Sequence, residues 1–253
     1  MILTSDFSKA ELLKNNNISN FDIQFFETMS STQTYAKEFL QKTPLYRGVI
    51  IANEQTDAYG RFGKPFHAPE SYGIYMTFVL PNFPVDISHI TMYIAICYVR
   101  AIKKITGINV FVKWVNDLFI GNLKVAGILT EFINDTYIIG IGLNFFNKKE
   151  QIPNSLKDVI TALYMDNYPQ ITRNQLTTEL INTIMTLKLT NDEILAEYKN
   201  YLFILGKKVI VTNGNIKYTS TAIDLDDMGY LVLESEQGKK ETIVAGEVSI
   251  RPF

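Results

Sequence analysis

The chain has 253 residues with 24 Lys and Arg against 26 Asp and Glu, a formal charge of −2, and its 47% hydrophobic share excludes global disorder. The longest apolar run, Met92 to Val99, is far shorter than the roughly 20 residues that cross a bilayer, so we expect no membrane partner. One cysteine and two histidines exclude an internal disulfide and disfavour a Cys/His zinc site, while the balanced charge disfavours a broad nucleic-acid-binding surface.

The N-terminal segment, residues 1–17, lacks a basic stretch followed by an apolar stretch and a cleavage site. We therefore expect a cytoplasmic protein, and at most one short helix in this segment. Next, Ser30, Ser31 and Thr32 are good N-cap residues before apolar residues at helical spacing, which predicts a helix over 33–41.

Two β-branched segments, 48–53 and 73–80, predict strands, and a glycine-punctuated loop over 54–72 joins them. Residues 88–106 place apolar side chains three or four positions apart, which predicts a helix that packs on the core.

The segments 110–114, 118–120, 124–132 and 136–145 alternate with short turns and predict an antiparallel meander. Two helices should follow, because Thr172 with Gln175 and Thr190 with Glu193 have capping-box spacing.

The texture changes from Gly206 onward, where short alternating segments are broken by Gly, Asn and Asp. This pattern predicts a small β-barrel, too small to be stable alone, that packs on a larger domain. We place the boundary near 205, which gives a domain over 1–205 and a second over 206–253.

The loop EQTDAYGRFGKPF, residues 54–66, gathers Gly60, Arg61, Gly63 and Lys64 within five positions. Free backbone N–H groups and two cations in such a loop can bind an anion such as a phosphate. The alternative is a plain surface loop with scattered charges.

The segment KWVND, residues 113–117, carries Lys113 on an otherwise apolar strand, with Asn116 and Asp117 at the strand end. A buried Lys needs a carboxylate, a phosphate or solvent. Asp117 beside a polyphosphate could hold Mg²⁺, which proteins bind through one or two carboxylates plus phosphate oxygens. The alternative is an edge strand whose Lys reaches solvent while Asn-Asp forms the turn.

The segments KVAGIL (124–129) and GIGLN (140–144) place glycines inside strands. Gly127 and Leu129 with Lys124 nearby suit an apolar ligand that ends in a carboxylate, since a strand glycine leaves room for a ligand. Gly140 and Gly142 leave a second strand face bare, and a β-bulge is the alternative there.

These motifs, in this order and together with SSTQ (30–33) and GEVSIR (246–251), resemble the biotin protein ligases from about residue 22 to the end. The resemblance implies an α+β fold with a mixed β-sheet and flanking helices, shared with the lipoate ligases, plus a C-terminal SH3-like β-barrel.

The resemblance also implies roles for individual residues. Biotin would contact Ser31, Thr32, Gln55, Gly127, Leu129, Gly140 and Gly142. Lys124 would meet the carboxylate and the phosphate, with Arg61 and Lys113 as the other catalytic cations. The nucleotide would contact Gly60, Gly63, Lys64, Phe66, Asn116 and Asn144, and Asp117 would be associated with Mg²⁺.

The implied reaction has two steps. Biotin and MgATP give biotinyl-5′-adenylate, and a lysine of a carboxylase's biotin-carboxyl-carrier domain then takes the biotin. The early position of Ser30 leaves no space for an N-terminal DNA-binding domain, so we expect a monofunctional enzyme without DNA as a partner. A homodimer is possible, and the sequence does not decide it.

The loop departs from the usual family pattern at Ala58 and Tyr59, which stand where a glycine and an arginine are usual. Because Tyr59 cannot supply the missing charge, we predict weaker retention of the adenylate or slower ordering of the loop. Two alternatives stay open: a lipoate–protein ligase-like acyltransferase, and a non-catalytic regulator that binds biotin or a nucleotide.

Overall fold

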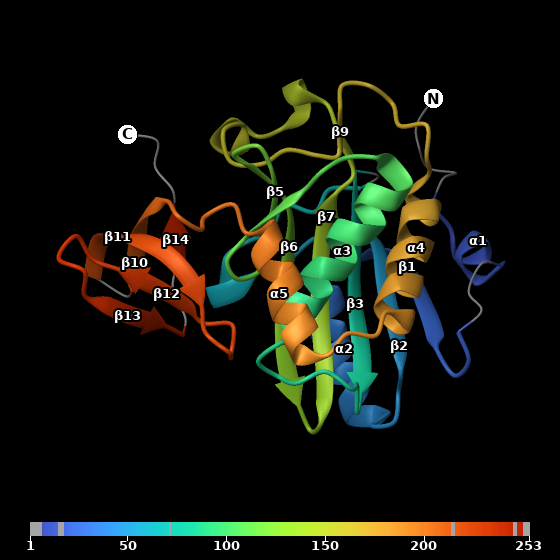
Figure 1. Cartoon of the computed structure of the whole chain (residues 1–253). Helices are drawn as coiled ribbons and strands as arrows, with labels where there is room; N and C mark the ends of the chain where they lie inside the picture. The colour runs from blue at the N-terminus through green and yellow to red at the C-terminus, as the bar shows by residue number, and fades with distance from the viewer. Residues whose placement is uncertain (1–6, 15–17, 71, 214–215, 245–246, 250–253) are drawn as a thin grey trace.

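A seven-stranded mixed sheet forms the centre of the computed structural model, which describes residues 7–14, 18–70, 72–213, 216–244 and 247–249. The strand order is β1-β2-β3-β7-β6-β5-β4 (Figure 1). The strands are β1 (Asp22–Met29), β2 (Gly48–Gln55), β3 (Gly73–Pro81), β4 (Phe111–Lys113), β5 (Asp117–Ile120), β6 (Leu123–Ile133) and β7 (Thr136–Asn144). Among the described strands of this sheet, only β1 and β2 pair in parallel, and the meander from β4 to β7 is antiparallel as predicted.

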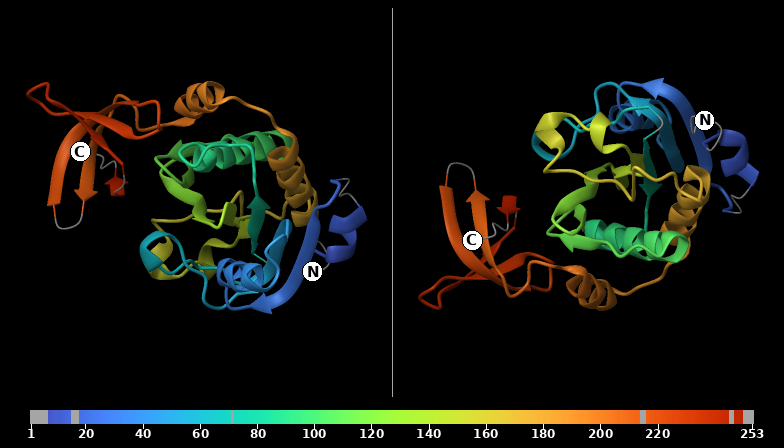
Figure 2. Two further views of the ribbon diagram at one scale, coloured as in Figure 1. Left: turned by 90° about the horizontal axis from the view of Figure 1, so that it is seen from below. Right: turned by 90° about the horizontal axis from the view of Figure 1, so that it is seen from above.

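Helices cover both faces of this sheet (Figure 2). They are α1 (Lys9–Lys14), α2 (Thr32–Lys42), α3 (Ile90–Thr106), α4 (Arg173–Thr186) and α5 (Asn191–Tyr201). The larger core cluster joins α3, α4 and α5 to one face, to which Ile74, Met76 and Phe78 point. The other face packs Ile50 and Val79 against α2. In the described part of the chain, no helix is long and apolar enough to cross a membrane.

The predicted helix starts are confirmed by their caps. Ser31 Oγ accepts from the backbone N–H of Thr34 and begins α2. Thr172 and Thr190 open α4 and α5, each with a complete capping box. Such caps satisfy backbone donors that the first helical turn leaves without partners.

The strand predicted over 110–114 ends one residue early, at Lys113. Residues 114–116 form a turn, so side-chain alternation does not extend from Lys113 to Val115. The turn brings Asp117 back opposite Lys113 at the start of β5. The predicted continuation of the strand past Lys113 is therefore wrong, because the chain turns before Val115.

The C-terminal segment forms a five-stranded antiparallel sheet in the order β13-β12-β11-β10-β14, set to one side of the large sheet (Figure 2). Its strands are β10 (Lys208–Asn213), β11 (Ile216–Leu225), β12 (Leu231–Glu234), β13 (Lys240–Ile243) and β14 (Glu247–Ser249). A small third sheet pairs β8 (Phe146–Asn147) with β9 (Tyr164–Met165). Of GEVSIR, Gly246, Ile250 and Arg251 lie outside the described residues. The predicted α+β fold class is confirmed, and the proposed boundary near 205 lies between α5 and β10.

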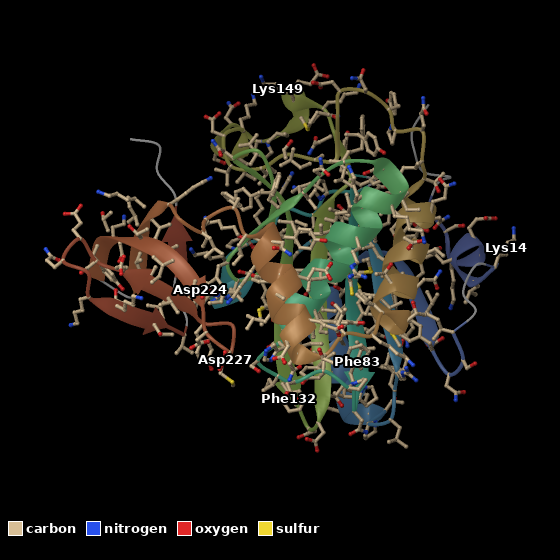
Figure 3. The ribbon with its side chains drawn as sticks, viewed as in Figure 1. Lys14, Phe83, Phe132, Lys149, Asp224 and Asp227 are labelled. Carbon is tan, nitrogen blue, oxygen red and sulfur yellow. The ribbon has the colours of Figure 1, made fainter. Side chains whose placement is uncertain are left out.

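A hydrogen bond and an ion pair join this small sheet to the larger part of the chain. Trp114 Nε1 donates to the carbonyl of Gly229 at 3.0 Å. The ammonium of Lys199 on α5 lies 2.7 Å from Asp224 Oδ1 on β11, at the side of the small sheet that faces α5 (Figure 3). Each contact joins a residue near the large sheet to the small one.

Candidate active site

Gly127, Gly140 and Gly142 leave part of the face of the sheet that α2 covers without side chains. Gly127 on β6 stands opposite Gly142 on β7, and Leu129 stands opposite Gly140. The register of β7 against both neighbours is continuous, so the β-bulge considered for this strand is wrong. Strands β6 and β7 therefore present a shallow floor at the site predicted for biotin.

Side chains of the protein itself cover this floor. An added Cβ would meet Gln33 Oε1 at 2.5 Å from Gly140, the ring of Phe66 at 2.5 Å from Gly142, and Lys124 Nζ at 3.0 Å from Gly127. The absence of side chains thus lets all three groups approach the backbone closely. In this conformation a ligand on Gly142 has to displace the Phe66 ring.

A network of buried polar side chains lies at one end of the floor, at the start of α2. Gln55 Oε1 accepts from the backbone N–H of Thr32 at 2.7 Å and from its hydroxyl at 3.0 Å. The hydroxyl of Thr77, which is fully buried, donates to Thr32 Oγ1 at 2.9 Å. Ser31 is also buried and caps α2. Polar groups fixed in this way can orient a polar ring such as an ureido group.

Lys124 and Asp117 form an ion pair at the other end of the floor, with Nζ 2.8 Å from Oδ1. Both side chains are about one-quarter exposed. Asp117 stands opposite Gly127 in the sheet, and Lys124 bends back over the same glycine. The prediction that Lys124 and Gly127 share one space is confirmed.

The 54–66 loop folds back on itself as a tight hairpin. Gly60 N donates to the Lys64 carbonyl at 2.8 Å, and Gly63 N donates to the Gly60 carbonyl at 3.2 Å. Lys64 N donates to the Arg61 carbonyl at 3.3 Å. The expected free N–H groups are therefore wrong for this conformation, because the loop satisfies these donors internally.

Arg61 connects this loop to the KWVND segment. Its Nη1 donates to Asn116 Oδ1 at 3.1 Å, and Asn116 Nδ2 donates to the Ile128 carbonyl at 3.0 Å. Lys113 stands opposite Asp117 on the edge strand β4, with its ammonium 5.4 Å from the Phe119 ring centroid. Arg61 and Lys124 therefore contact two neighbouring residues, Asn116 and Asp117, from two separate segments. Lys113 stands beside them in the sheet, with its ammonium over Phe119.

Asn144 borders the same floor beyond Gly142. Its Nδ2 donates to the Thr161 carbonyl at 2.9 Å. The backbone of Thr161 also bonds to the Lys124 carbonyl, and Lys124 N donates to the Val159 carbonyl. Residues 159–161 thus run alongside Lys124 and are hydrogen-bonded to its backbone. The sequence did not indicate this neighbour.

Three polar residues at the floor were missed as site residues. Gln33 ends the motif SSTQ, Glu131 lies two residues after the segment KVAGIL, and Thr77 is the one threonine in the apolar strand GIYMTFVL. Gln33 Nε2 donates to Glu131 Oε2 at 2.7 Å, and Thr77 Oγ1 donates to Gln33 Oε1 at 3.3 Å. A polar residue in an apolar strand was the available signal.

Two family profiles match the chain. The Biotin/lipoate A/B protein ligase family matches residues 25–144, and the Biotin protein ligase C terminal domain matches residues 204–251. The chain belongs to the biotin protein ligase family. The predicted family and enzyme class, a ligase, are confirmed.

Individual relatives agree with this membership. The bifunctional ligase/repressor BirA of Bacillus spizizenii is 29% identical over 229 residues, which cover 85% of this chain and 70% of the relative. The biotin–[acetyl-CoA-carboxylase] ligase of Mycobacterium tuberculosis is 24% identical and covers 79% and 77%. The structure of a biotin protein ligase from Aquifex aeolicus, in complex with biotin and ATP, has a TM-score of 0.72 at 23% identity and covers 91% and 98%, which shows the shared fold.

Proposed function

We propose that this chain is an ATP-dependent biotin–protein ligase that forms biotinyl-5′-adenylate and transfers biotin to a lysine of a carrier domain. The observation that carries this proposal is the meeting of Lys124, Asp117, Asn116 and Arg61 at the end of the glycine floor. The relatives reported above carry the names of ligases, and the one from Mycobacterium tuberculosis is named a biotin–[acetyl-CoA-carboxylase] ligase. We propose a carboxylase carrier domain as the acceptor.

In the first step, a biotin carboxylate oxygen attacks the α-phosphorus of ATP, and pyrophosphate leaves. This step brings anions together, so Lys124, Lys113 and Arg61 would reduce their repulsion and stabilise the charge that develops. In the second step, the amine of the acceptor lysine attacks the acyl carbon, AMP leaves, and the amine loses a proton. The polar groups at the start of α2 would orient biotin for both steps.

Asp117 would hold Mg²⁺ together with the phosphates. In the described residues there is no cluster of three or more His, Cys, Asp or Glu side chains that could bind a metal alone. One carboxylate near the phosphates nevertheless fits Mg²⁺, which usually keeps several waters and takes few protein ligands. When bound, Mg²⁺ supplies positive charge to the polyphosphate.

The two alternatives predict different substrates. A lipoate–protein ligase would use lipoate in place of biotin, and a non-catalytic regulator would bind without turnover. The polar network around Thr32, Gln55 and Thr77 favours biotin, because hydrogen-bonding groups at the far end of the floor match a polar ring better than a dithiolane.

The test incubates the protein with ATP, Mg²⁺ and either biotin or lipoate, follows pyrophosphate release, and then adds a biotin-carboxyl-carrier domain. We expect release and carrier labelling with biotin alone. Lipoate-dependent release would establish the first alternative, and biotin binding without release would establish the second.

A further inference from the structure

The 54–66 loop contacts helix α2 through Lys37. The ammonium of Lys37 lies 5.6 Å from the centroid of the Tyr59 ring, within the range of a cation–π contact. The same ammonium lies 3.0 Å from Glu131 Oε1 on β6. Lys37 thus joins the loop, the helix and the sheet.

The pKa of the Lys37 ammonium reflects these contacts. Burial by itself lowers the pKa of the Lys37 ammonium, but hydrogen bonds with Tyr59 and Glu131 and the negative charge of Glu131 outweigh it and raise the pKa. The lysine is therefore charged at neutral pH, and it is held by both neighbours at once.

Glu131 extends the connection to the glycine floor. Its second oxygen, Oε2, accepts from Gln33 Nε2 at 2.7 Å, and Gln33 Nε2 also donates to the Ile138 carbonyl at 3.2 Å. Gln33 Oε1 in turn lies over the bare backbone of Gly140. The contacts run without a break from Tyr59 through Lys37, Glu131 and Gln33 to the predicted biotin site.

Tyr59 is the position at which the loop lacks the arginine that the family pattern usually has there. A tyrosine cannot grip a phosphate as an arginine does, but its ring and hydroxyl can hold a neighbouring ammonium. We propose that Tyr59 and Lys37 are positioning residues, which hold the 54–66 loop against helix α2 and so slow its opening, both in the ligand-free protein and, once the Phe66 ring has moved off Gly142, with the adenylate bound. This inference rests on the proposed function, since the adenylate is the ligand to be retained.

A first experiment measures how readily the loop opens in the absence of ligand. Phe62, at the tip, is 69% exposed, and chymotrypsin should cut after it whenever the loop opens locally. We expect Lys37→Met and Tyr59→Ala to accelerate this cleavage about threefold to thirtyfold, the range for an exposed cation–π contact together with a surface ion pair. Tyr59→Phe, which keeps the ring, should have a smaller effect.

A double variant tests whether the two residues act as one unit. Tyr59→Ala combined with Lys37→Met should cleave no faster than either single variant, because each change already removes the shared contact. Lys37→Arg should restore slow cleavage, because it keeps the cation. Lys42→Met, an exposed lysine on the same helix, is the matched control and should leave cleavage unchanged.

A second experiment connects the loop to the site. In Lys37→Met the dissociation rate of biotinyl-5′-adenylate should rise by a similar factor, while the urea midpoint stays at the wild-type value. Additive cleavage rates in the double variant, or unchanged cleavage in Lys37→Met, would overturn the proposal. Faster cleavage with an unchanged dissociation rate would overturn its second part. Failure of the wild type to form any adenylate would refute the proposed function but not the loop contact measured by cleavage.

Discussion

Lys124 has two neighbours that define what it can do. Asp117 Oδ1 lies 2.8 Å from its ammonium, and the backbone of Gly127 lies beneath it without a side chain. The carboxylate therefore holds the ammonium in place above Gly127. A bound carboxylate or phosphate would find this cation already positioned, which reduces the reorganisation that the reaction requires.

Replacing this cation should therefore affect the reaction and not the fold. We expect Lys124→Met to lower the rate of adenylate formation by about 10²-fold or more, the cost of removing one electrostatic stabiliser. Single-turnover formation of biotinyl-5′-adenylate measures it. Lys149→Met, at an exposed lysine that is not one of the predicted site residues (Figure 3), is the control and should keep the wild-type rate. Equal rates in both variants would contradict the role of Lys124.

The contact between Gly142 and Phe66 predicts how a side chain at position 142 would affect biotin binding. A Cβ at position 142 would lie 2.5 Å from the Phe66 ring, so Gly142→Ala has to push the ring outward. We expect a folded protein that binds biotin at least about tenfold more weakly, since the methyl group occupies part of the floor. Titration calorimetry with biotin measures this affinity. Unchanged affinity would show that biotin does not lie on Gly142.

The sequence predicted the residues around the floor better than their contacts. Glycines inside strands indicated a bare face, and Lys124 was placed beside it correctly. Spacing along the chain could not reveal that Phe66 and Gln33 fill that face, because both come from distant segments. Composition likewise did not indicate that the N–H groups of Gly60, Gly63 and Lys64, expected to be exposed to an anion, donate to carbonyls within the loop.

At the scale of elements, capping signals located the helices closely. Thr190 and Glu193 lie three positions apart, and each side chain bonds to the other's backbone N–H at the start of α5. The end of β4 was less predictable, since VFVKW continues the apolar pattern past the residue at which the chain turns. Local chemistry thus fixes where a helix starts more firmly than where a strand stops.

The Thr190 cap should contribute to the stability of α5. Thr190→Ala should lower the free energy of unfolding by about 1 kcal/mol, the usual cost of losing an N-cap hydroxyl. Urea unfolding followed by circular dichroism measures the change. Thr186→Ala, at an exposed position in the last turn of α4, is the matched control and should change the free energy by less than about 0.5 kcal/mol. Equal losses in the two variants would show that the cap does not stabilise α5.

Across the molecule, the small C-terminal sheet contacts the larger part of the chain near the KWVND segment. Trp114, which belongs to that segment, donates to Gly229 in the small sheet. The same turn therefore bears Asn116 and Asp117 on one side and an inter-sheet hydrogen bond on the other. This arrangement gives the small sheet a structural connection to the site that its position along the chain does not suggest.

The ion pair between Lys199 and Asp224 should make this connection sensitive to acid. The hydrogen bond from Lys199 lowers the pKa of Asp224 below its ordinary value of 3.8, although burial opposes the shift. The contribution is therefore present above about pH 4 and is lost as the pH falls through the lowered pKa. Because Asp224 is 56% exposed, we expect Lys199→Met to cost at most about 0.5 kcal/mol at pH 7.

Urea unfolding of the wild type and Lys199→Met at pH 7 and at pH 3 measures this difference. The gap between the two proteins should narrow at the lower pH. A gap that is equal or larger at pH 3 would contradict the assignment of the stabilisation to this ion pair.

We propose that the chain activates biotin as an adenylate at the end of the glycine floor, where Lys124 pairs with Asp117 and Arg61 contacts Asn116. Exchange of labelled pyrophosphate into ATP, measured with Mg²⁺ and without a carrier domain, tests it most directly. We predict exchange that requires biotin, is absent with lipoate, and falls by about 10²-fold in Lys124→Met. Exchange that does not depend on biotin, or that persists at the wild-type rate in Lys124→Met, would contradict the claim.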